Sequence, residues 1–590
     1  MSRSLKPDAS PARPVLANYF VSILPINISL TKETFRIPIF EKILQFPMKR
    51  FFFGILLAIS LGTAALAQQA PKKPKLVVGI IVDQMRQEYF YRFADRFGEG
   101  GFKRFTQQGF MMTNGHYNYI PTYTGPGHAS VYTGATPSTH GVIGNNWYVP
   151  SLKKMIYCAE DSLVSNVGGT PDNGKISPRN LLTTTITDEL RLSTGKRSKV
   201  VGIAIKDRGA SLPAGHTGDA YWYDDANGDW MTSTYYKQTL PTWVMNFNAK
   251  KRPDHYLSQT WKTLFPVETY VNSLPDHNDF ESPFIGKDSP SFPYDLTALK
   301  AANGGYGLVP STPFGNSLTL DFAYAALEGE KLGLGEVTDF LAISFSSPDY
   351  IGHRFGPSSI EVEDNYLRMD REFAQFFTYL DQKLGKGEYL VFISADHAVA
   401  DVPQYMMSER IPAGNFNSGM VLGQLKGFAT THYGEGDWIL SFSNEQIFLN
   451  HALIREKKVD AEQMQHDLAN FVLGFAGVKE AYTASDLRKQ EFTQSRAHLL
   501  QMGYNHKASG DVLLVLEPAW LVGGKRGTTH GSGYSYDTHV PIAFYGWGIK
   551  AGKSSSYASV TDIAPTLAAL LQIRMPNGTT GQPIQAVIGN

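Results

Sequence analysis

The chain has 590 residues with 54 basic and 54 acidic side chains; 42% of its residues are hydrophobic and 12% are aromatic. This apolar content excludes an intrinsically disordered protein, and the balanced charge argues against a nucleic-acid-binding protein. With the single cysteine Cys158 the chain can form no internal disulfide and no thiolate zinc site, so any metal must be held by His, Asp or Glu.

Residues 48–67 have the pattern of a secretory signal peptide. A basic start at Met48 is followed by a short apolar run and by Ala65-Leu66-Ala67, so cleavage is expected after Ala67. The run is shorter than the ~20 residues of a membrane span, which favours a periplasmic or secreted protein without a stable membrane anchor; an N-terminal anchor is the alternative. Because signal peptides begin at the initiator methionine, we expect Met48 to be the true start and residues 1–47 to be an upstream extension.

Short apolar runs that stop at a polar residue are typical of parallel strands buried on both faces. Four such runs occur: Leu76–Val82 before Asp83, Lys199–Ile205 before Lys206, Phe340–Phe345 before Asp349, and Leu390–Ile393 before Asp396.

A helix is expected between the last two runs. Ser358–Glu361 has the sequence of a capping box, and apolar residues recur at helical spacing from Tyr366 to Leu380, before a stop at Leu384-Gly385. Strand, helix and strand predict a right-handed parallel crossover.

These elements predict an α/β fold with a mostly parallel sheet flanked by helices and with large insertions. Further strands are expected at Asp511–Leu516 and Val540–Tyr545, and a closing helix at Val560–Ile573. The predicted catalytic core comprises residues 75–208, 339–400 and 510–590. Residues 209–338 are expected to be a loop-rich insertion, and residues 401–509, with a helix at Ala461–Gly474, a compact cap subdomain.

Ligands of open parallel sheets bind beyond the carboxyl ends of the strands, where several polar segments are expected here. Asp349 and His353 are four residues apart, so both lie on one face of a helical turn and either could bind zinc. An isolated Asp-His pair is more often a cap or a turn. Several such segments together point to a site: Val82-Asp83-Gln84, Ser347–His353, Ser394–Ala398 with Asp396 and His397, and Gly527–Ser532 with His530.

A hydroxyl group that could join this site lies in Pro121–His128. Small residues around Thr124 expose a turn before a helical segment expected from Ala129, and a hydroxyl at a helix N-terminus favours an anion such as phosphate. An ordinary helix cap is the alternative for Thr124.

Taken together, these segments resemble the alkaline phosphatase superfamily, and most closely the secreted bacterial alkaline phosphatases with a Thr nucleophile and a Lys-x-Arg pair. The resemblance covers nearly all of the mature chain. The matching motifs are Asp83 after the first strand, Pro-Thr-Tyr-Thr124, Gly-Asn145-Asn-Trp, Lys206-Asp-Arg208-Gly, Asp349 to His353, Ala-Asp396-His397, Thr-His530-Gly and Thr561-Asp-Ile-Ala-Pro-Thr-Leu.

The resemblance implies an alkaline-phosphatase-like fold and two zinc ions per chain. Asp349, His353 and His530 would hold one zinc; Asp83, Asp396 and His397 would hold the other, with Thr124 as a further ligand. Thr124 would attack phosphorus to give a phosphothreonine that water hydrolyses. Asn145, Lys206 and Arg208 would bind the phosphoryl oxygens, and the cationic pair favours monoesters over diesters.

The nearest alternative is a phosphodiesterase or nucleotide pyrophosphatase of the same superfamily, and Lys206 with Arg208 argues against it. A sulfatase would need a Cys/Ser-x-Pro-x-Arg pattern, which neither Thr124 nor Cys158 begins. A phosphoglycerate mutase would use a Ser nucleophile in the cytosol, and a non-catalytic binding protein would be expected to lose ligands. The expected partners are small phosphate monoesters; the oligomeric state is left open, with a monomer favoured.

Overall fold

The computed structural model describes residues 72–589, and the predicted signal peptide, the predicted start at Met48 and the predicted upstream extension lie outside this range. Within it, no helix combines the length and the apolar character needed to cross a membrane.

Ten strands of the described chain form one large sheet, with β1 (Leu76–Val82) near its middle. β11 (Asp339–Phe345) and β12 (Tyr389–Ser394) flank β1, and both pair with it in parallel. All seven residues of β1 and of β11 are buried, because helices cover both faces of the sheet. The outer strands are β6 (Val200–Ala204), β7 (Asp219–Asp224), β8 (Asp229–Ser233) and β5 (Asn166–Val167) on one side, and β19 (Ile542–Gly546), β2 (Phe110–His116) and β20 (Gly552–Ser559) on the other.

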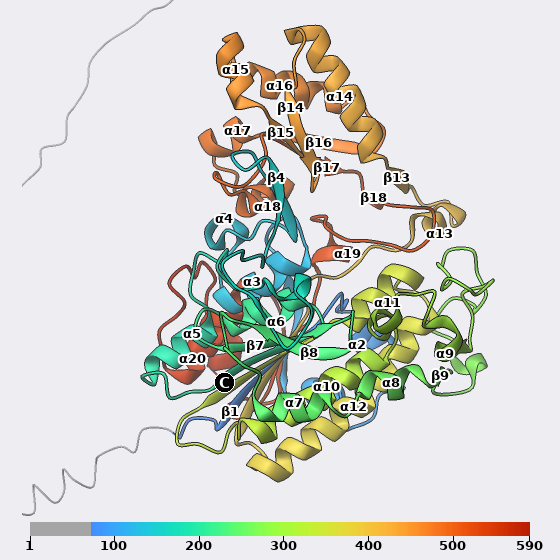
Figure 1. Cartoon of the computed structure of the whole chain (residues 1–590), viewed down its shortest axis with the longest axis vertical. Coiled ribbons are helices and arrows are strands. Elements are labelled where there is room, and N and C mark those ends of the chain that lie inside the picture. Colours follow the sequence, from blue (N-terminus) through green and yellow to red (C-terminus); the bar gives the residue numbers. More distant parts are fainter. Residues whose placement is uncertain (1–71, 590) are drawn as a thin grey trace, which may run out of the picture. The chain divides into compact units, whose positions relative to one another are not determined.

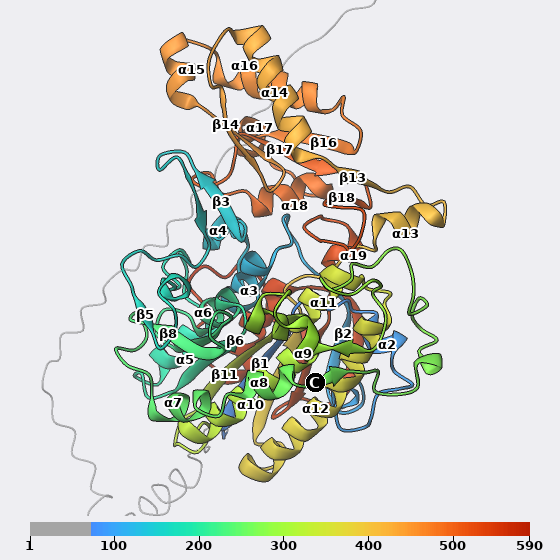
Figure 2. The same ribbon diagram turned by 45° about the vertical axis from the view of Figure 1, so that its right-hand side comes forward.

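The sheet is parallel through its centre, and β19, β8 and β5 run against their neighbours, while the edge strand β20 pairs with β2 in parallel. The expected mostly parallel α/β fold is therefore confirmed. Helices lie on both faces (Figures 1 and 2): α3 (Thr124–Thr133), α5 (Ile186–Ser193), α6 (Asp207–Ala214) and α20 (Ile563–Leu571) on one, and α7 (Thr242–Asn248), α10 (Phe314–Gly329) and α12 (Ile360–Leu384) on the other.

The predicted crossover helix is α12, which joins β11 to β12 as expected. Its cap differs from the predicted capping box. The side chain of Ser359, not Ser358, accepts the hydrogen bond from Val362 N, and Glu361 instead accepts the hydroxyl of the buried Tyr294. Tertiary contacts therefore use the carboxylate that the local pattern assigned to the cap.

The region predicted to be the cap has a sheet and a hydrophobic core of its own (Figure 1). β14 (Ile439–Ser443), β15 (Gln446–Leu449), β17 (Val512–Leu516) and β16 (Val478–Thr483) form an antiparallel sheet, and β13 (Gly414–Phe416) pairs with β18 (Trp520–Val522). Its helices are α14 (Ser418–Tyr433), α15 (His451–Lys457), α16 (Ala461–Val472), α17 (Ala484–Lys489) and α18 (Ser495–Gly503).

Two predicted segment assignments are corrected by the sheet pairing. Val512–Leu516, predicted for the core, pairs with β15 and β16 and so belongs to the cap. The predicted loop-rich insertion 209–338 supplies β7 and β8 to the main sheet and α10 to one of its faces. Apolar runs identify strands, but they do not reveal which sheet a strand joins.

Candidate active site

The candidate site lies at the carboxyl ends of the central strands. Asp83 follows β1 directly, Asp396 comes two residues after β12, and Asp349 lies in the first turn of α11 (Ser347–Phe355), which follows β11. Parallel pairing of these three strands brings their ends to one edge. The carboxylates and three histidines form two groups, each with its ligand atoms within 4.8 Å of one another.

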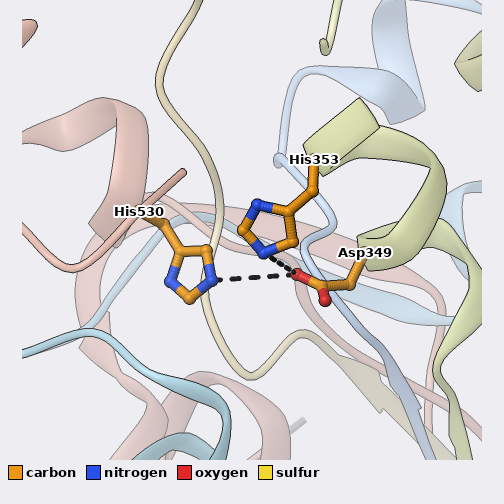
Figure 3. A group of neighbouring side chains, drawn as sticks. All are labelled: Asp349, His353 and His530. Atoms are coloured by element: carbon orange, nitrogen blue, oxygen red, sulfur yellow. Dashed lines mark ion pairs between the residues drawn. The ribbon is translucent and has the colours of Figure 1, made fainter. Parts of the chain in front are cut away.

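The first group consists of Asp349, His353 and His530 (Figure 3). Asp349 and His353 project from the same face of α11, and His353 Nε2 lies 3.1 Å from Asp349 Oδ1. His530 faces them from a C-terminal loop, with its Nε2 3.7 Å from the same oxygen. The predicted i, i+4 spacing therefore places both side chains toward one point, and a segment almost 180 residues later completes the group.

The second group consists of Asp83, Asp396 and His397, all fully buried. His397 Nε2 lies 3.5 Å from Asp83 Oδ1 and 3.4 Å from Asp396 Oδ2. The groups adjoin, since the rings of His397 and His530 are stacked with centroids 3.4 Å apart.

All three imidazoles are oriented through the nitrogen that faces away from the carboxylates. His353 Nδ1 and His530 Nδ1 each lie 2.7 Å from a backbone carbonyl, of Thr528 and Thr122, and His397 Nδ1 lies 3.0 Å from Ala398 O. A carbonyl can only accept, so each Nδ1 carries the proton and Nε2 keeps a lone pair for a metal.

Burial keeps two of these imidazoles neutral. Together with the neighbouring His353 it lowers the pKa of His530 to about 4, and together with His530 it lowers the pKa of His397 well below its usual value. Neutral imidazole is the form that binds a divalent ion.

The donor set fits divalent cations. Asp83 Oδ1 and Asp396 Oδ2 are buried, and within residues 72–589 neither has a hydrogen-bond donor. Burial and the charge of Asp83 raise the pKa of Asp396 well above its ordinary value. Closely spaced buried carboxylates are costly unless a cation compensates them, and carboxylate with imidazole is a ligand set that suits zinc.

Lys206 links the two groups. Its Nζ lies 2.6 Å from Asp83 Oδ2 and 2.5 Å from Asp349 Oδ2. Burial alone would lower the pKa of Lys206, but the two carboxylates hold it above its ordinary value, so the side chain is a fixed cation at the centre of the site.

Thr124 is the first residue of α3 and is 1% exposed. Its Oγ1 lies 3.4 Å from His397 Nε2, so the hydroxyl faces the second group. The helix begins at Thr124 rather than at Ala129 as predicted, and Tyr123 is its N-cap without a capping side chain. The hydroxyl therefore lies at a helix N-terminus, which favours anions, and does not serve as the cap.

The remaining two predicted residues lie at the margin of these contacts. Asn145 Oδ1 accepts a hydrogen bond of 2.7 Å from Gly125 N, directly beside Thr124. Arg208 lies in the first turn of α6, two residues after Lys206, and its Nη1 donates to the hydroxyl of Tyr157 over 3.1 Å. Eight predicted residues are thus joined by direct contacts, Asn145 is joined through Gly125, and Arg208 is oriented by Tyr157.

Gln84 is a site residue whose role the sequence did not reveal. Its Nε2 donates to Asp349 Oδ1 over 2.7 Å and its backbone N to Asp396 Oδ1 over 3.1 Å, so it contacts both groups. Its φ of +67° directs these contacts, and no sequence pattern signals that conformation. A Cβ at Gly352 would lie 1.8 Å from Gln84 Oε1, which explains the glycine between Asp349 and His353.

The comparisons with known proteins agree with this geometry. The family model for type I phosphodiesterase / nucleotide pyrophosphatase matches residues 77–541. A protein named calcium-transporting ATPase from Myroides odoratus is 46% identical over 530 residues, which cover 89% of this chain and 96% of that protein. Alkaline phosphatase PhoV of Synechococcus elongatus is 44% identical over 519 residues, 88% of this chain and 93% of that protein.

A solved structure is also similar. Alkaline phosphatase PafA of Elizabethkingia meningoseptica is 42% identical over 545 residues, 92% of this chain and 99% of that protein. The PafA crystal structure has a TM-score of 0.85 and covers 88% of this chain and 100% of that one. A PafA variant with one threonine, one asparagine, one lysine and one arginine substituted has been solved as well. The chain belongs to the type I phosphodiesterase / nucleotide pyrophosphatase family, and the expected relationship to bacterial alkaline phosphatases is confirmed.

Proposed function

We propose that the protein is an exported di-zinc alkaline phosphatase that hydrolyses phosphate monoesters through a phosphothreonine. One observation carries the proposal: two carboxylate–imidazole groups adjoin, Thr124 Oγ1 faces one of them, and Lys206 contacts both. The relatives named alkaline phosphatase support it over 88% to 92% of the chain.

The metal ligands are assigned by group. Asp349, His353 and His530 would hold one zinc, and Asp83, Asp396 and His397, with Thr124, the other. When bound, the two ions would supply Lewis-acid stabilisation to the entering and leaving oxygens of an in-line displacement.

Thr124 performs the covalent step. Its hydroxyl loses its proton and Oγ1 forms a bond to phosphorus while the bond from phosphorus to the leaving oxygen breaks; that oxygen takes up a proton and departs as the alcohol on the opposite side. Water then attacks the phosphothreonine, which releases phosphate and restores the hydroxyl. The N-terminus of α3 favours the phosphoryl charge throughout.

The phosphoryl oxygens are bound by Lys206, Arg208 and Asn145. A monoester presents more negative charge than a diester, so an ammonium and a guanidinium favour it. The four residue types substituted in the solved PafA variant, Thr, Asn, Lys and Arg, are those of Thr124, Asn145, Lys206 and Arg208, which supports the assignment.

Export rests on the sequence of residues 48–67, which has the order of a signal peptide. The corresponding mature protein is periplasmic or secreted, acts on small phosphate monoesters and binds no nucleic acid; its oligomeric state is left open, with a monomer favoured.

The test compares an aryl phosphate with its alkyl diester on one preparation of the zinc-loaded protein. The proposal predicts a much larger kcat/KM for the monoester, and equal or greater diester efficiency would instead assign a phosphodiesterase. ATP belongs in the same panel because the Myroides relative is named an ATPase and ATP hydrolysis also transfers a phosphoryl group.

A further inference from the structure

A cavity of about 300 Å³ lies between the core and the cap, beside the first group. Its core wall contains Tyr123 and the loop of residues 529–533, which carries His530. Its cap wall contains the turn Asn444-Glu445 and parts of β17 and β18. The lining includes His530 of the first group and no ligand of the second group, and Tyr123, which directly precedes Thr124, also lines it.

That position is where a leaving alcohol would depart. Thr124 Oγ1 faces the second group through His397, and in-line displacement puts the leaving oxygen opposite the attacking one. The first group, with His530, adjoins the second through the stacked rings of His397 and His530, and so can hold the leaving oxygen while Thr124 attacks from the second group. An organic group attached to the leaving oxygen would therefore project toward the cavity.

The cap turn at the cavity is held in a strained conformation. Asn444 and Glu445, between β14 and β15, have φ values of +52° and +55°. Asparagine tolerates this region, but a glutamate adopts it only at a cost, and such strain often marks a functional position. The turn contacts both flanks of the phosphoryl site: Asn444 Nδ2 donates to Asn146 O over 2.7 Å, and Tyr123 OH donates to Glu445 Oε2 over 3.2 Å.

One wall of the cavity is apolar, and Thr529, His530 and Ser532 add polar groups beside the turn. Leu513 and Val515 alternate on β17 with residues of the cap core and pack with Ile120 on the cavity side. Trp520 adds an aromatic wall, and Glu445 is a half-buried acceptor at the edge. Its volume is at the small end of the ~300–1,000 Å³ range of ligand pockets, which suits one ring.

We propose that this cavity is the leaving-group subsite, and that it selects alcohols with a single aromatic ring bearing a hydrogen-bond donor for Glu445. The inference rests on the proposed phosphatase function and names the substrate class of that site.

The first test fills the cavity with a larger side chain. We measure kcat/KM of Val515→Phe for phenyl phosphate and for methyl phosphate. The phenyl-to-methyl ratio of the variant is then compared with the same ratio of wild type, so that the intrinsic reactivity of the two leaving groups cancels. The ratio of the two kcat/KM values should fall roughly fivefold or more, because a ring that no longer fits loses its apolar contacts. Leu473→Phe, at an exposed position after α16, is the matched control and should leave the ratio unchanged.

The second test removes the charge of the acceptor and keeps its shape. Wild type should prefer 4-(aminomethyl)phenyl phosphate over 4-methylphenyl phosphate, and Glu445→Gln should reduce that preference about tenfold, as expected for a charge-assisted hydrogen bond. The stability of this variant is checked by its melting temperature.

The outcomes separate the two proposals. Failure of the wild type to hydrolyse methyl phosphate or any aryl phosphate would remove the phosphatase function itself. Active enzyme with unchanged ratios in both variants would overturn the subsite alone. If Val515→Phe does not fold, the Glu445→Gln preference decides.

Discussion

The core and the cap contribute to the site in different ways. In the core, Asp83 and Asp396 come at the ends of the buried strands β1 and β12, and the histidines are fixed by backbone carbonyls. The cap reaches the site mainly through a two-residue turn, by side-chain hydrogen bonds to Tyr123 and to the backbone of Asn146. A sheet edge fixes the atoms for bond making, whereas a hairpin tip suits recognition of what varies among substrates. Core substitutions should therefore remove turnover, and cap substitutions should change selectivity.

The largest expected effect is that of Thr124→Ala. Without the nucleophile, turnover of an aryl monoester should fall at least roughly 10³-fold, because no covalent intermediate can form. The metal content should stay at the wild-type level, since the Asp and His side chains remain. Single-turnover kinetics and metal analysis check both, and near-normal turnover would show that another group attacks phosphorus.

Replacing the cationic pair should have the next largest effect. In Lys206→Ala with Arg208→Ala each lost charge-assisted contact costs roughly 1.5–3 kcal/mol, so monoester kcat/KM should fall tenfold or more per contact. Diester kcat/KM should fall less, because a diester carries less charge. An unchanged monoester rate in the double variant would remove the basis for monoester specificity.

The cap is tested by Asn444→Gly. Glycine keeps the positive φ of the turn and removes only the hydrogen bond to Asn146 O. A neutral hydrogen bond is worth about 1 kcal/mol, so kcat/KM should fall about fivefold or less. A loss of kcat/KM as large as that of Thr124→Ala would show that the cap turn is needed for bond making and does not act on selectivity alone.

The smallest expected effect concerns stability, away from the site. His216 Nδ1 lies 3.1 Å from Asp188 Oδ2, and this bond raises the pKa of His216 against the effect of burial. The pair's contribution to the free energy of unfolding is complete below the usual histidine pKa of about 6.5. It is lost as pH rises through the raised pKa of His216 in the folded protein. The side chain is 32% exposed, so the contribution is about 1 kcal/mol or less.

Urea unfolding of wild type and His216→Gln at several pH values measures this pair. The difference in the free energy of unfolding should shrink between about pH 6 and pH 8. A difference that grows over that interval would show that His216 is neutral in the folded protein.

The core was readily predicted from sequence because the signals there are local. Buried runs ending in Asp83, Asp349 and Asp396 identify strands, and parallel strands must bring their ends to one edge. The assignment of the strand Val512–Leu516 to the main sheet was wrong, because an apolar run of this length fits either the main sheet or the cap sheet. The role of Gln84 depends on a positive φ, and that of Glu445 on contact with Tyr123, 322 residues earlier; neither leaves a local pattern.

The di-zinc assignment requires seven side chains from distant segments to hold two divalent cations. Metal analysis by mass spectrometry on the purified protein, after extensive dialysis against metal-free buffer, tests it most directly. About two zinc ions per chain are expected in wild type, and about one in a variant with Asp83→Asn and Asp396→Asn. Fewer than about one zinc per wild-type chain, in protein that is folded and active, would contradict it.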